Sequence, residues 1–256
     1  MDNNILIIGA GNLGSEIALS YNDCHAGKRV EKIYIYDINQ KKQKFFESSK
    51  HIVFVKDLSN ALKKSKFIIL AIKPKDYKNV CVRIKDELKK NTIVMSVMAG
   101  VKINSLRKEL PSSTQFVRLM TNLNIKVFQG TSFIYASNKI INIDKNKIEK
   151  FWGRMGSVHW LKSESNIDKF TALIGSGPAY FIYFCECLVK VFKDFGLAEK
   201  DAKIFVYQLF FGTALLCRPS NGDPKFRQWK NMIASKGGTT QEALNILEKG
   251  KLTSIL

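Results

Sequence analysis

The sequence predicts an α/β fold in which a domain built on a mainly parallel sheet is followed by an all-helical domain. From residue 5 to about residue 161, short apolar runs alternate with amphipathic stretches, a pattern typical of a parallel sheet covered by helices. From about residue 166 onward the strand signal stops, and long apolar phases at helical spacing replace it. A glycine-rich turn also joins the first apolar run directly to the first amphipathic stretch.

The elements follow from these patterns in chain order. The second domain, residues 163–256, is expected to hold helices at residues 179–195, 202–217 and 239–249, with Gly196 marking the end of the first. The first domain, residues 1–162, is expected to contain strands rich in β-branched and aromatic residues. These strands are Ile5–Ile8, Lys32–Tyr36, Val53–Val55, Phe67–Ala71, Thr92–Val97, Gln115–Leu119, Thr131–Tyr135 and Ser157–Trp160.

The helices at 179–195 and 202–217 are apolar over more faces than a free surface allows. We therefore expect a homodimer, or a higher oligomer of dimers, in which helical domains interleave. The apolar stretch 172–192 also contains glycines, a proline, Glu186 and Lys190, which favours a buried helix over a membrane span. No basic segment precedes the first strand, so no signal peptide is expected.

The chain carries a formal charge of +19, which is compatible with a nucleic acid, a membrane surface or an acidic small molecule as partner. Only seven of its 41 basic residues are Arg, by count, and the Lys residues are scattered without a long run. Nucleic-acid recognition favours the forked guanidinium group. We expect a small-molecule substrate, no nucleic acid and no membrane.

The five cysteines form no CxxC pair and are an odd number, which predicts reduced thiols and a cytoplasmic protein. Cys185 and Cys187 are two residues apart, so on a helix they would point about 200° apart and could not share a metal. The three histidines, His25, His51 and His159, are scattered. No metal site is expected.

A dinucleotide-binding motif opens the chain. The run Gly9-Ala10-Gly11-Asn12-Leu13-Gly14 follows an apolar strand and precedes an amphipathic helix, as the GxGxxG motif requires. Its first glycine permits the tight turn, its second lets the backbone approach a pyrophosphate, and its third lets helix and strand pack closely. The motif predicts that the first domain is a Rossmann domain and that these six residues bind NADH or NADPH.

Asp37 ends the second expected strand, 23 residues after Gly14. An acidic residue there accepts hydrogen bonds from the adenine ribose, which slightly favours NAD over NADP. Lys41 and Lys42 follow closely and would tolerate a 2'-phosphate, so both cofactors stay open. In the alternative interpretation, Asp37 only caps the next helix.

Two further turns follow strands at the edge of the sheet where ligands bind. Ala71-Ile72-Lys73-Pro74 is expected to contact the cofactor, although Pro74 could simply start a helix. Ala99 and Gly100 end the segment Ser96-Val-Met-Ala-Gly100, whose small residues leave room for a nicotinamide ring.

Several segments together resemble the pyrroline-5-carboxylate reductase family along nearly the whole chain. GSGPAY at 175–180 and SxGGTT at 235–240 are the specific ones, because the other segments also occur in related dehydrogenases. Those others are Gly9 to Gly14, Ala71 to Pro74, Ser96 to Gly100, and Arg118-Leu-Met-Thr-Asn122. The resemblance implies a Rossmann domain followed by a helical domain through which subunits dimerise. It also implies reduction of 1-pyrroline-5-carboxylate to L-proline, the last step of proline biosynthesis.

The resemblance further assigns site residues. Asn122 is implied in cofactor binding, and Thr240 matches the threonine near the ring nitrogen of the substrate. Substrate contacts are implied for Ser176, Ser235, Gly237, Gly238, Thr239 and Thr240. Two glycines and two threonines before an apolar helix do make a helix N-terminus suited to a small carboxylate. Alternatively, a threonine only caps that helix, and residues 175–178 form only a packing turn.

A protonated imine is already an electrophile, so the chemistry needs orientation more than a strong acid or base. Two departures from the family pattern bear on activity. The segment Met120-Thr121-Asn122-Leu123-Asn124 lacks two prolines, which should loosen it, and Lys236 replaces a proline. The alternatives are therefore a non-catalytic dinucleotide-binding relative, or a reductase of another imine or of a hydroxy acid.

Overall fold

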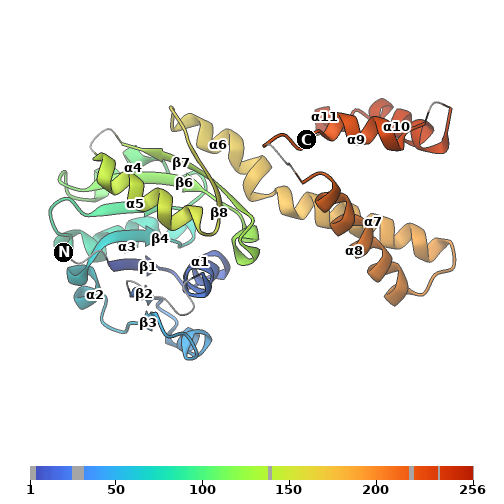
Figure 1. Ribbon diagram of the computed structural model, residues 1–256. Helices are drawn as coiled ribbons and strands as arrows, with labels where there is room; N and C mark the ends of the chain where they lie inside the picture. Colours follow the sequence, from blue (N-terminus) through green and yellow to red (C-terminus); the bar gives the residue numbers. More distant parts are fainter. Residues whose placement is uncertain (1–3, 25–31, 138–139, 219–221, 236, 256) are drawn as a thin grey trace. The chain divides into compact units, whose positions relative to one another are not determined.

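The computed structural model describes residues 4–24, 32–137, 140–218, 222–235 and 237–255 (Figure 1). The chain forms two compact units, Met1–Pro178 and Ala179–Leu256. The domain boundary expected after residue 162 stays a prediction, because the segment that follows is helical but still packs on the sheet through Phe170, which stacks on Phe133.

The first unit is built on one sheet in the order β3-β2-β1-β4-β5-β6-β7-β8. All neighbouring strands are parallel except β6 and β7, so β7 and β8 run against the other six. The strands are β1 (Asn4–Ile8), β2 (Ile33–Tyr36), β3 (Ile52–Phe54), β4 (Ser65–Leu70), β5 (Ile93–Ser96), β6 (Gln115–Met120), β7 (Gly130–Ala136) and β8 (Gly156–Trp160). The eight predicted strands and the mainly parallel sheet are confirmed.

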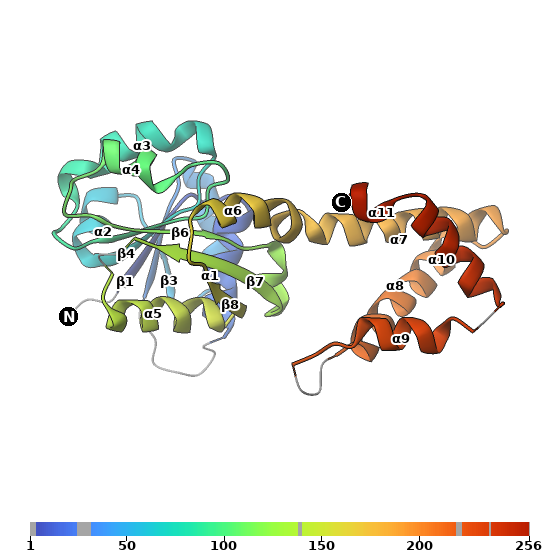
Figure 2. The same cartoon turned by 90° about the horizontal axis from the view of Figure 1, so that it is seen from above.

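Helices cover both faces of this sheet, with α3 and α4 on one side and α5 on the other (Figure 2). They are α1 (Asn12–Asp23), α2 (Leu58–Lys64), α3 (Tyr77–Ile84), α4 (Ile103–Glu109), α5 (Asn142–Gly153) and α6 (Ser165–Phe170). Short helical turns η1 (Gln40–Phe46), η2 (Pro74–Asp76), η3 (Lys85–Glu87), η4 (Leu123–Val127) and η5 (Thr171–Gly175) connect them.

Alternate residues of the central strands feed two separate cores. Ile5 and Ile7 of β1 join the core that includes Trp152 of α5. Leu6 and Ile8 of the same strand join the core that includes Leu106 of α4. Because both faces are buried, the central strands are continuously apolar instead of alternating, which is why the sequence pattern located them.

The second unit is entirely helical in the part of the chain that the structure describes. α7 (Gly177–Asp194) leads into it, and α8 (Glu199–Leu216), α9 (Phe226–Ile233), α10 (Thr239–Lys249) and α11 (Leu252–Ile255) follow. The three predicted helices are confirmed, and Gly196 has φ +91° directly after α7, the left-handed conformation of a helix stop. α9 and α11 were not predicted.

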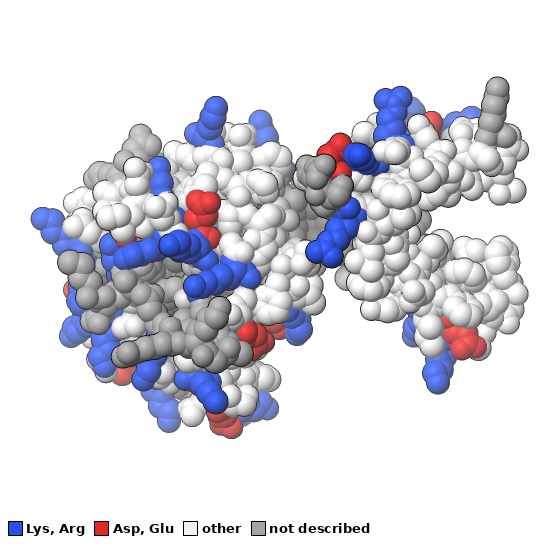
Figure 3. Space-filling model, in the orientation of Figure 1, with Lys and Arg blue, Asp and Glu red and all other residues white. Residues whose placement is uncertain are grey.

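α7 and α8 leave large apolar side chains exposed. Phe181 is 62% exposed and Tyr207 is also 62% exposed, and uncharged surface dominates over these helices in Figure 3. The expectation that the stretch 172–192 is buried is therefore wrong for a single chain, where Gly177 is the one buried residue of α7. The continuous helical stretch Ser165–Asp194 is also long and apolar enough to cross a membrane, by length and composition only. Apolar faces of this kind require a partner.

We predict that Phe211→Glu makes the protein monomeric, because an unpaired carboxylate buried against apolar side chains opposes association. Phe211 is 46% exposed in the single chain, and we expect its replacement to weaken association at least about 100-fold. Phe45→Glu, at an exposed phenylalanine of the first unit, is the matched control. Light scattering coupled to gel filtration measures both masses, and an unchanged mass for Phe211→Glu would contradict the prediction.

Candidate cofactor and substrate site

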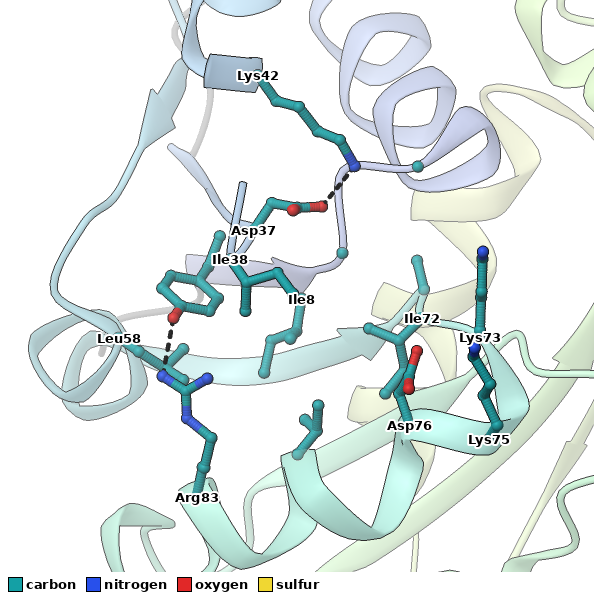
Figure 4. Close-up of a pocket in the computed structure, with 15 residues that line it drawn as sticks. Ile8, Asp37, Ile38, Lys42, Leu58, Ile72, Lys73, Lys75, Asp76 and Arg83 are labelled. Atoms are coloured by element: carbon teal, nitrogen blue, oxygen red, sulfur yellow. Dashed lines mark hydrogen bonds and ion pairs between the residues drawn. The ribbon is translucent and has the colours of Figure 1, made fainter. Parts of the chain in front are cut away.

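A cavity of about 370 Å³ lies at the carboxyl edge of the sheet, between the loops that follow β1 and β4 (Figure 4). These two strands are neighbours at the point where the strand order reverses, the usual ligand position in doubly wound sheets. Gly9, Gly11 and Asp37 line the cavity together with Ala71, Ile72 and Lys73. Six of the predicted cofactor residues therefore meet at one cavity.

The three motif glycines occupy positions that restrict side chains differently. Gly9 has φ +105°, and a Cβ there would lie 2.4 Å from the carbonyl oxygen of Ala71. A Cβ on Gly14 would lie 2.0 Å from the carbonyl oxygen of Gly9. Around Gly11, by contrast, no atom lies within 4 Å of a built Cβ. The first and third glycines serve close packing, while the second leaves open space at the start of α1.

The helix N-terminus at this space suits an anion. α1 begins at Asn12 with Gly11 as its N-cap, and its first turn holds no acidic residue. Unpaired N–H groups and the helix dipole favour a phosphate there. Ala10 is buried, and Leu13 packs against the core below, so these two residues hold the turn in place. The residues present fit a dinucleotide pyrophosphate.

Asp37 is braced by three hydrogen bonds. Its Oδ2 accepts from the Ala10 N–H at 2.8 Å and from Lys42 Nζ at 2.8 Å, and its Oδ1 accepts from the Asn39 N–H at 2.8 Å. Asn39 is the residue that caps η1, by accepting from the Lys41 N–H. The interpretation of Asp37 as only a helix cap is therefore wrong.

Burial alone would raise the pKa of Asp37, but the hydrogen bonds from Lys42, Asn39 and Ala10 outweigh it and lower the pKa from its usual value. The carboxylate is thus ionised at neutral pH. Because folding lowers this pKa, the stability that Asp37 contributes is present above the unfolded pKa and is lost as the pH falls through the folded one.

The rest of the cavity wall is apolar with basic groups at its margin. Ile38, Leu58 and Val80 offer apolar surface, and Lys75 and Arg83 add positive charge. Arg83 Nη2 donates to the hydroxyl of Tyr36 at 2.9 Å, as drawn in Figure 4. This combination suits an adenine ring with a phosphorylated ribose. Sequence reasoning missed Arg83, Lys75 and Asp76, which belong to the elements directly after the predicted turn at 71–74.

Pro74 is the first residue of η2, as the simpler interpretation of that turn expected. Ala71, Ile72 and Lys73 nevertheless line the cavity. The helical start and the cofactor contact are therefore compatible at this turn.

Ala99, Gly100 and Asn122 follow β5 and β6 at the same sheet edge but do not line this cavity. Gly100 has φ +73° with open space around it. The Asn122 side chain donates to the carbonyl of Ile174 at 3.1 Å and accepts from the Asn124 N–H at 3.2 Å. Cofactor contacts of these three residues stay predictions.

The altered segment 120–124 has its own anchors. Thr121 is buried, and its hydroxyl accepts from Ser132 Oγ at 2.9 Å. Together with the hydrogen bond from Asn122 to Ile174, this contact holds the segment against β7 and η5. The absence of the two prolines is expected to loosen the segment 120–124, and these hydrogen bonds oppose that loosening.

Ser176 belongs to the first unit, where it follows η5. The preceding Gly175 lies close to β6, since a Cβ there would be 3.2 Å from Met120 Sδ. Close packing at this turn supports the packing interpretation of residues 175–178 and leaves the predicted substrate contact of Ser176 a prediction.

The other predicted substrate residues form the start of α10 in the second unit. Gly238 is the N-cap and Thr239 the first helical residue. Gly237 has φ +73°, and a Cβ on Gly238 would lie 2.6 Å from Ser235 Oγ. Because glycine caps the helix, the interpretation in which Thr239 or Thr240 is only a cap is wrong. Lys236 lies outside the described residues.

Comparison with known proteins shows what this chain is similar to. Residues 164–256 match the family described as pyrroline-5-carboxylate reductase dimerisation. Residues 4–100 match the family described as NADP oxidoreductase, coenzyme F420-dependent. A pyrroline-5-carboxylate reductase of Staphylococcus epidermidis is 29% identical over 255 residues, which cover 98% of this chain and 92% of that protein.

The similarity to pyrroline-5-carboxylate reductases extends over nearly the whole chain. A solved reductase of this family from Coxiella burnetii has a TM-score of 0.86 at 28% identity, covering 100% of this chain and 93% of that one. The Plasmodium falciparum pyrroline carboxylate reductase with NADP bound shares the fold, with a TM-score of 0.85 at 24% identity over 100% of this chain and 93% of that one. The family's dimerisation region contains the exposed faces of α7 and α8, and the chain is a homo-oligomer.

We predict that two glycine substitutions in the cofactor motif change different properties of the protein. Gly14→Ala should lower the free energy of unfolding by about 1–3 kcal/mol, because its Cβ would collide with the carbonyl of Gly9. Gly11→Ala should leave thermal stability nearly unchanged and weaken dinucleotide binding, because its methyl group enters the pyrophosphate space. Thermal denaturation and calorimetric titration with NADH measure both, and a stable Gly14→Ala would contradict this assignment.

We predict that Lys42→Ala shifts cofactor selectivity toward NADH. Lys42 offsets the charge of Asp37 at 2.8 Å, and without it the carboxylate would repel a 2'-phosphate. The ratio of 2',5'-ADP affinity to 5'-AMP affinity should fall about tenfold, which calorimetric titration measures. Lys41→Ala, which removes an exposed lysine outside the cavity lining, should leave the ratio unchanged.

Proposed function

We propose that this protein reduces 1-pyrroline-5-carboxylate to L-proline, with NADPH or NADH as the hydride donor. The observation that carries the proposal is the glycine cradle at the strand-order reversal, in a chain that is similar to pyrroline-5-carboxylate reductases over nearly its whole length. The second unit supports it, because α10 begins at Thr239 with Gly238 as its N-cap, and a helix N-terminus suits a small carboxylate.

A reduced nicotinamide bound here would supply hydride to the imine carbon, and the C=N electron pair would move to the nitrogen, which already carries a proton. Gly11 leaves room for the pyrophosphate at the start of α1, where Gly9 and Gly14 let the turn and the helix pack closely. Asp37 and Lys42 bind the adenine ribose. Ala71 to Pro74 border the cofactor on the β4 side, and Ala99, Gly100 and Asn122 lie on the nicotinamide side.

The substrate is bound by the second unit in this proposal. The N–H groups of Gly237 and Thr239 and the hydroxyl of Ser235 bind the carboxylate, while the Gly238 N–H donates to the Ser235 carbonyl at 3.0 Å and shapes the turn. Thr240 accepts a hydrogen bond from the ring N–H and is the catalytic residue, and Ser176 shapes the pocket. Orientation supplies most of the rate, since a protonated imine needs no further acid.

The physiological form in this proposal is a cytoplasmic homodimer or an oligomer of dimers. All five cysteines lack disulfide partners in the described chain, as a reducing compartment requires. The apolar faces of α7 and α8 supply the subunit contact.

We predict that Thr240→Ala lowers kcat/KM for 1-pyrroline-5-carboxylate about 100-fold, because the ring nitrogen loses its hydrogen-bond partner. NADPH and NADH oxidation are followed in parallel. Thr240→Ser keeps the hydroxyl and should restore most of the rate. Thr213→Ala is the control, because that hydroxyl bonds only to the carbonyl of Leu209 within α8.

Absence of turnover by the native protein with either cofactor, while NADPH still binds, would refute the proposed reaction in favour of a non-catalytic relative. Turnover with a hydroxy acid in place of the imine would refute the substrate.

A further inference from the structure

Arg118 is a fully buried cation in the centre of the sheet. It lies on β6, beside Ser96 of β5, and its side chain is 0% exposed. A guanidinium removed from water is strongly destabilising unless carboxylates surround it. The carboxylates that pair with Arg118 must therefore stay in place if the carboxyl edge of the sheet is to keep its shape.

Two carboxylates meet this cation. Asp168 of α6 takes both terminal nitrogens, with Nη1 donating to its Oδ2 at 3.3 Å and Nη2 to its Oδ1. Glu164 is a weaker partner, at 3.4 Å from Nη1 to Oε1. Asp168 alone already satisfies the charge of Arg118, and the hydrogen bond from Arg118 lowers the pKa of Asp168 despite the opposing effect of burial.

The stronger contact of Glu164 is made elsewhere. The same Oε1 accepts from the Ile103 N–H at 2.7 Å. Ile103 is the first residue of α4, so it ends the loop 97–102 that begins directly after β5. One carboxylate oxygen thus joins the buried arginine of β6 to the end of the loop that contains Ala99 and Gly100.

This loop needs an external anchor. Ala99 and Gly100 are exposed, Gly100 has φ +73°, and the N-cap residue of α4, Lys102, makes no capping hydrogen bond through its own side chain. The loop is tied at its start by the Met98 N–H, which donates to Ser96 Oγ at 3.3 Å. Glu164 supplies the corresponding tie at its end.

We propose that Glu164, held by Arg118, is a positioning residue that sets the 97–102 loop against the nicotinamide ring. The inference rests on the proposed function in one respect, that Ala99 and Gly100 lie on the nicotinamide side of the cofactor. It assigns no chemical step to Glu164. Asp168 keeps the arginine buried. Glu164 contacts that fixed cation and, through the same oxygen, holds the end of the loop.

The test compares ligands with and without the nicotinamide ring. In Glu164→Ala, the affinity for NADH should fall about tenfold, while the affinity for ADP-ribose should change less than about twofold. Hydrogen exchange of the Ile103 amide should become at least about tenfold faster. In turnover assays, kcat should fall more than the KM for the imine rises.

The conservative variant separates positioning from charge. Glu164→Gln keeps a carbonyl oxygen that accepts from the Ile103 N–H, so it should restore NADH affinity and slow amide exchange to near native values. The matched control is Asp144→Asn. Asp144 is also ion-paired, to Lys66 at 2.6 Å, but Lys66 lies near the start of β4, at the opposite edge of the sheet.

Equal losses of NADH and ADP-ribose affinity in Glu164→Ala would overturn the inference, since general destabilisation produces that result. The same split in Asp144→Asn, or failure of Glu164→Gln to restore NADH affinity, would also overturn it. The native protein could also fail to reduce 1-pyrroline-5-carboxylate while Glu164→Ala loses affinity for NADH and keeps its affinity for ADP-ribose. That result would sustain this inference and refute the proposed reaction, because the binding measurements use no imine.

Discussion

The close approach of two backbones at the carboxyl edge of the sheet is the constraint on which the cofactor site depends. The turn after β1 lies so near the end of β4 that a methyl group on Gly9 would overlap the Ala71 carbonyl. The start of α1 in turn lies on the Gly9 carbonyl, where Gly14 leaves room. With these contacts made, the helix N-terminus points at open space around Gly11, and Asp37 reaches the Ala10 N–H from β2. The same backbone contacts therefore pack the edge of the sheet and form the cofactor site.

Much of this arrangement could be predicted from the sequence because its causes are local. The central strands are apolar on both faces, and the glycine motif lies between a strand and a helix within about twenty residues. The short helix α9 escaped prediction because its apolar residues, Phe226, Trp229 and Met232, are separated by polar ones over only eight positions. The exposure of α7 could be inferred only by treating a second copy of the chain as part of the fold.

The contacts that escaped prediction join residues far apart in the chain. Arg118 stands 46 residues before Glu164 and 50 before Asp168, and no periodicity predicts such a pairing. The spacing of the two acidic residues by four does place them on one side of a helix, but many exposed pairs share that spacing. Arg83 likewise reaches Tyr36 across 47 residues. Tertiary packing decides which charged groups lie beside the cavity and which remain on the surface.

The reversal of β7 and β8 has a consequence for the path of the chain. Because β7 runs against β6 and β8 runs parallel to β7, β8 ends toward the edge of the sheet opposite the carboxyl ends of β1 to β6. The segment that follows therefore runs back along the sheet, and its later part, from Phe170 to Gly175, lies beside Phe133 of β7 and beside Met120 and Asn122 at the end of β6. The return through α6 and η5, and not the direction of the last strand, brings the end of the first unit to the edge where the cofactor loops begin.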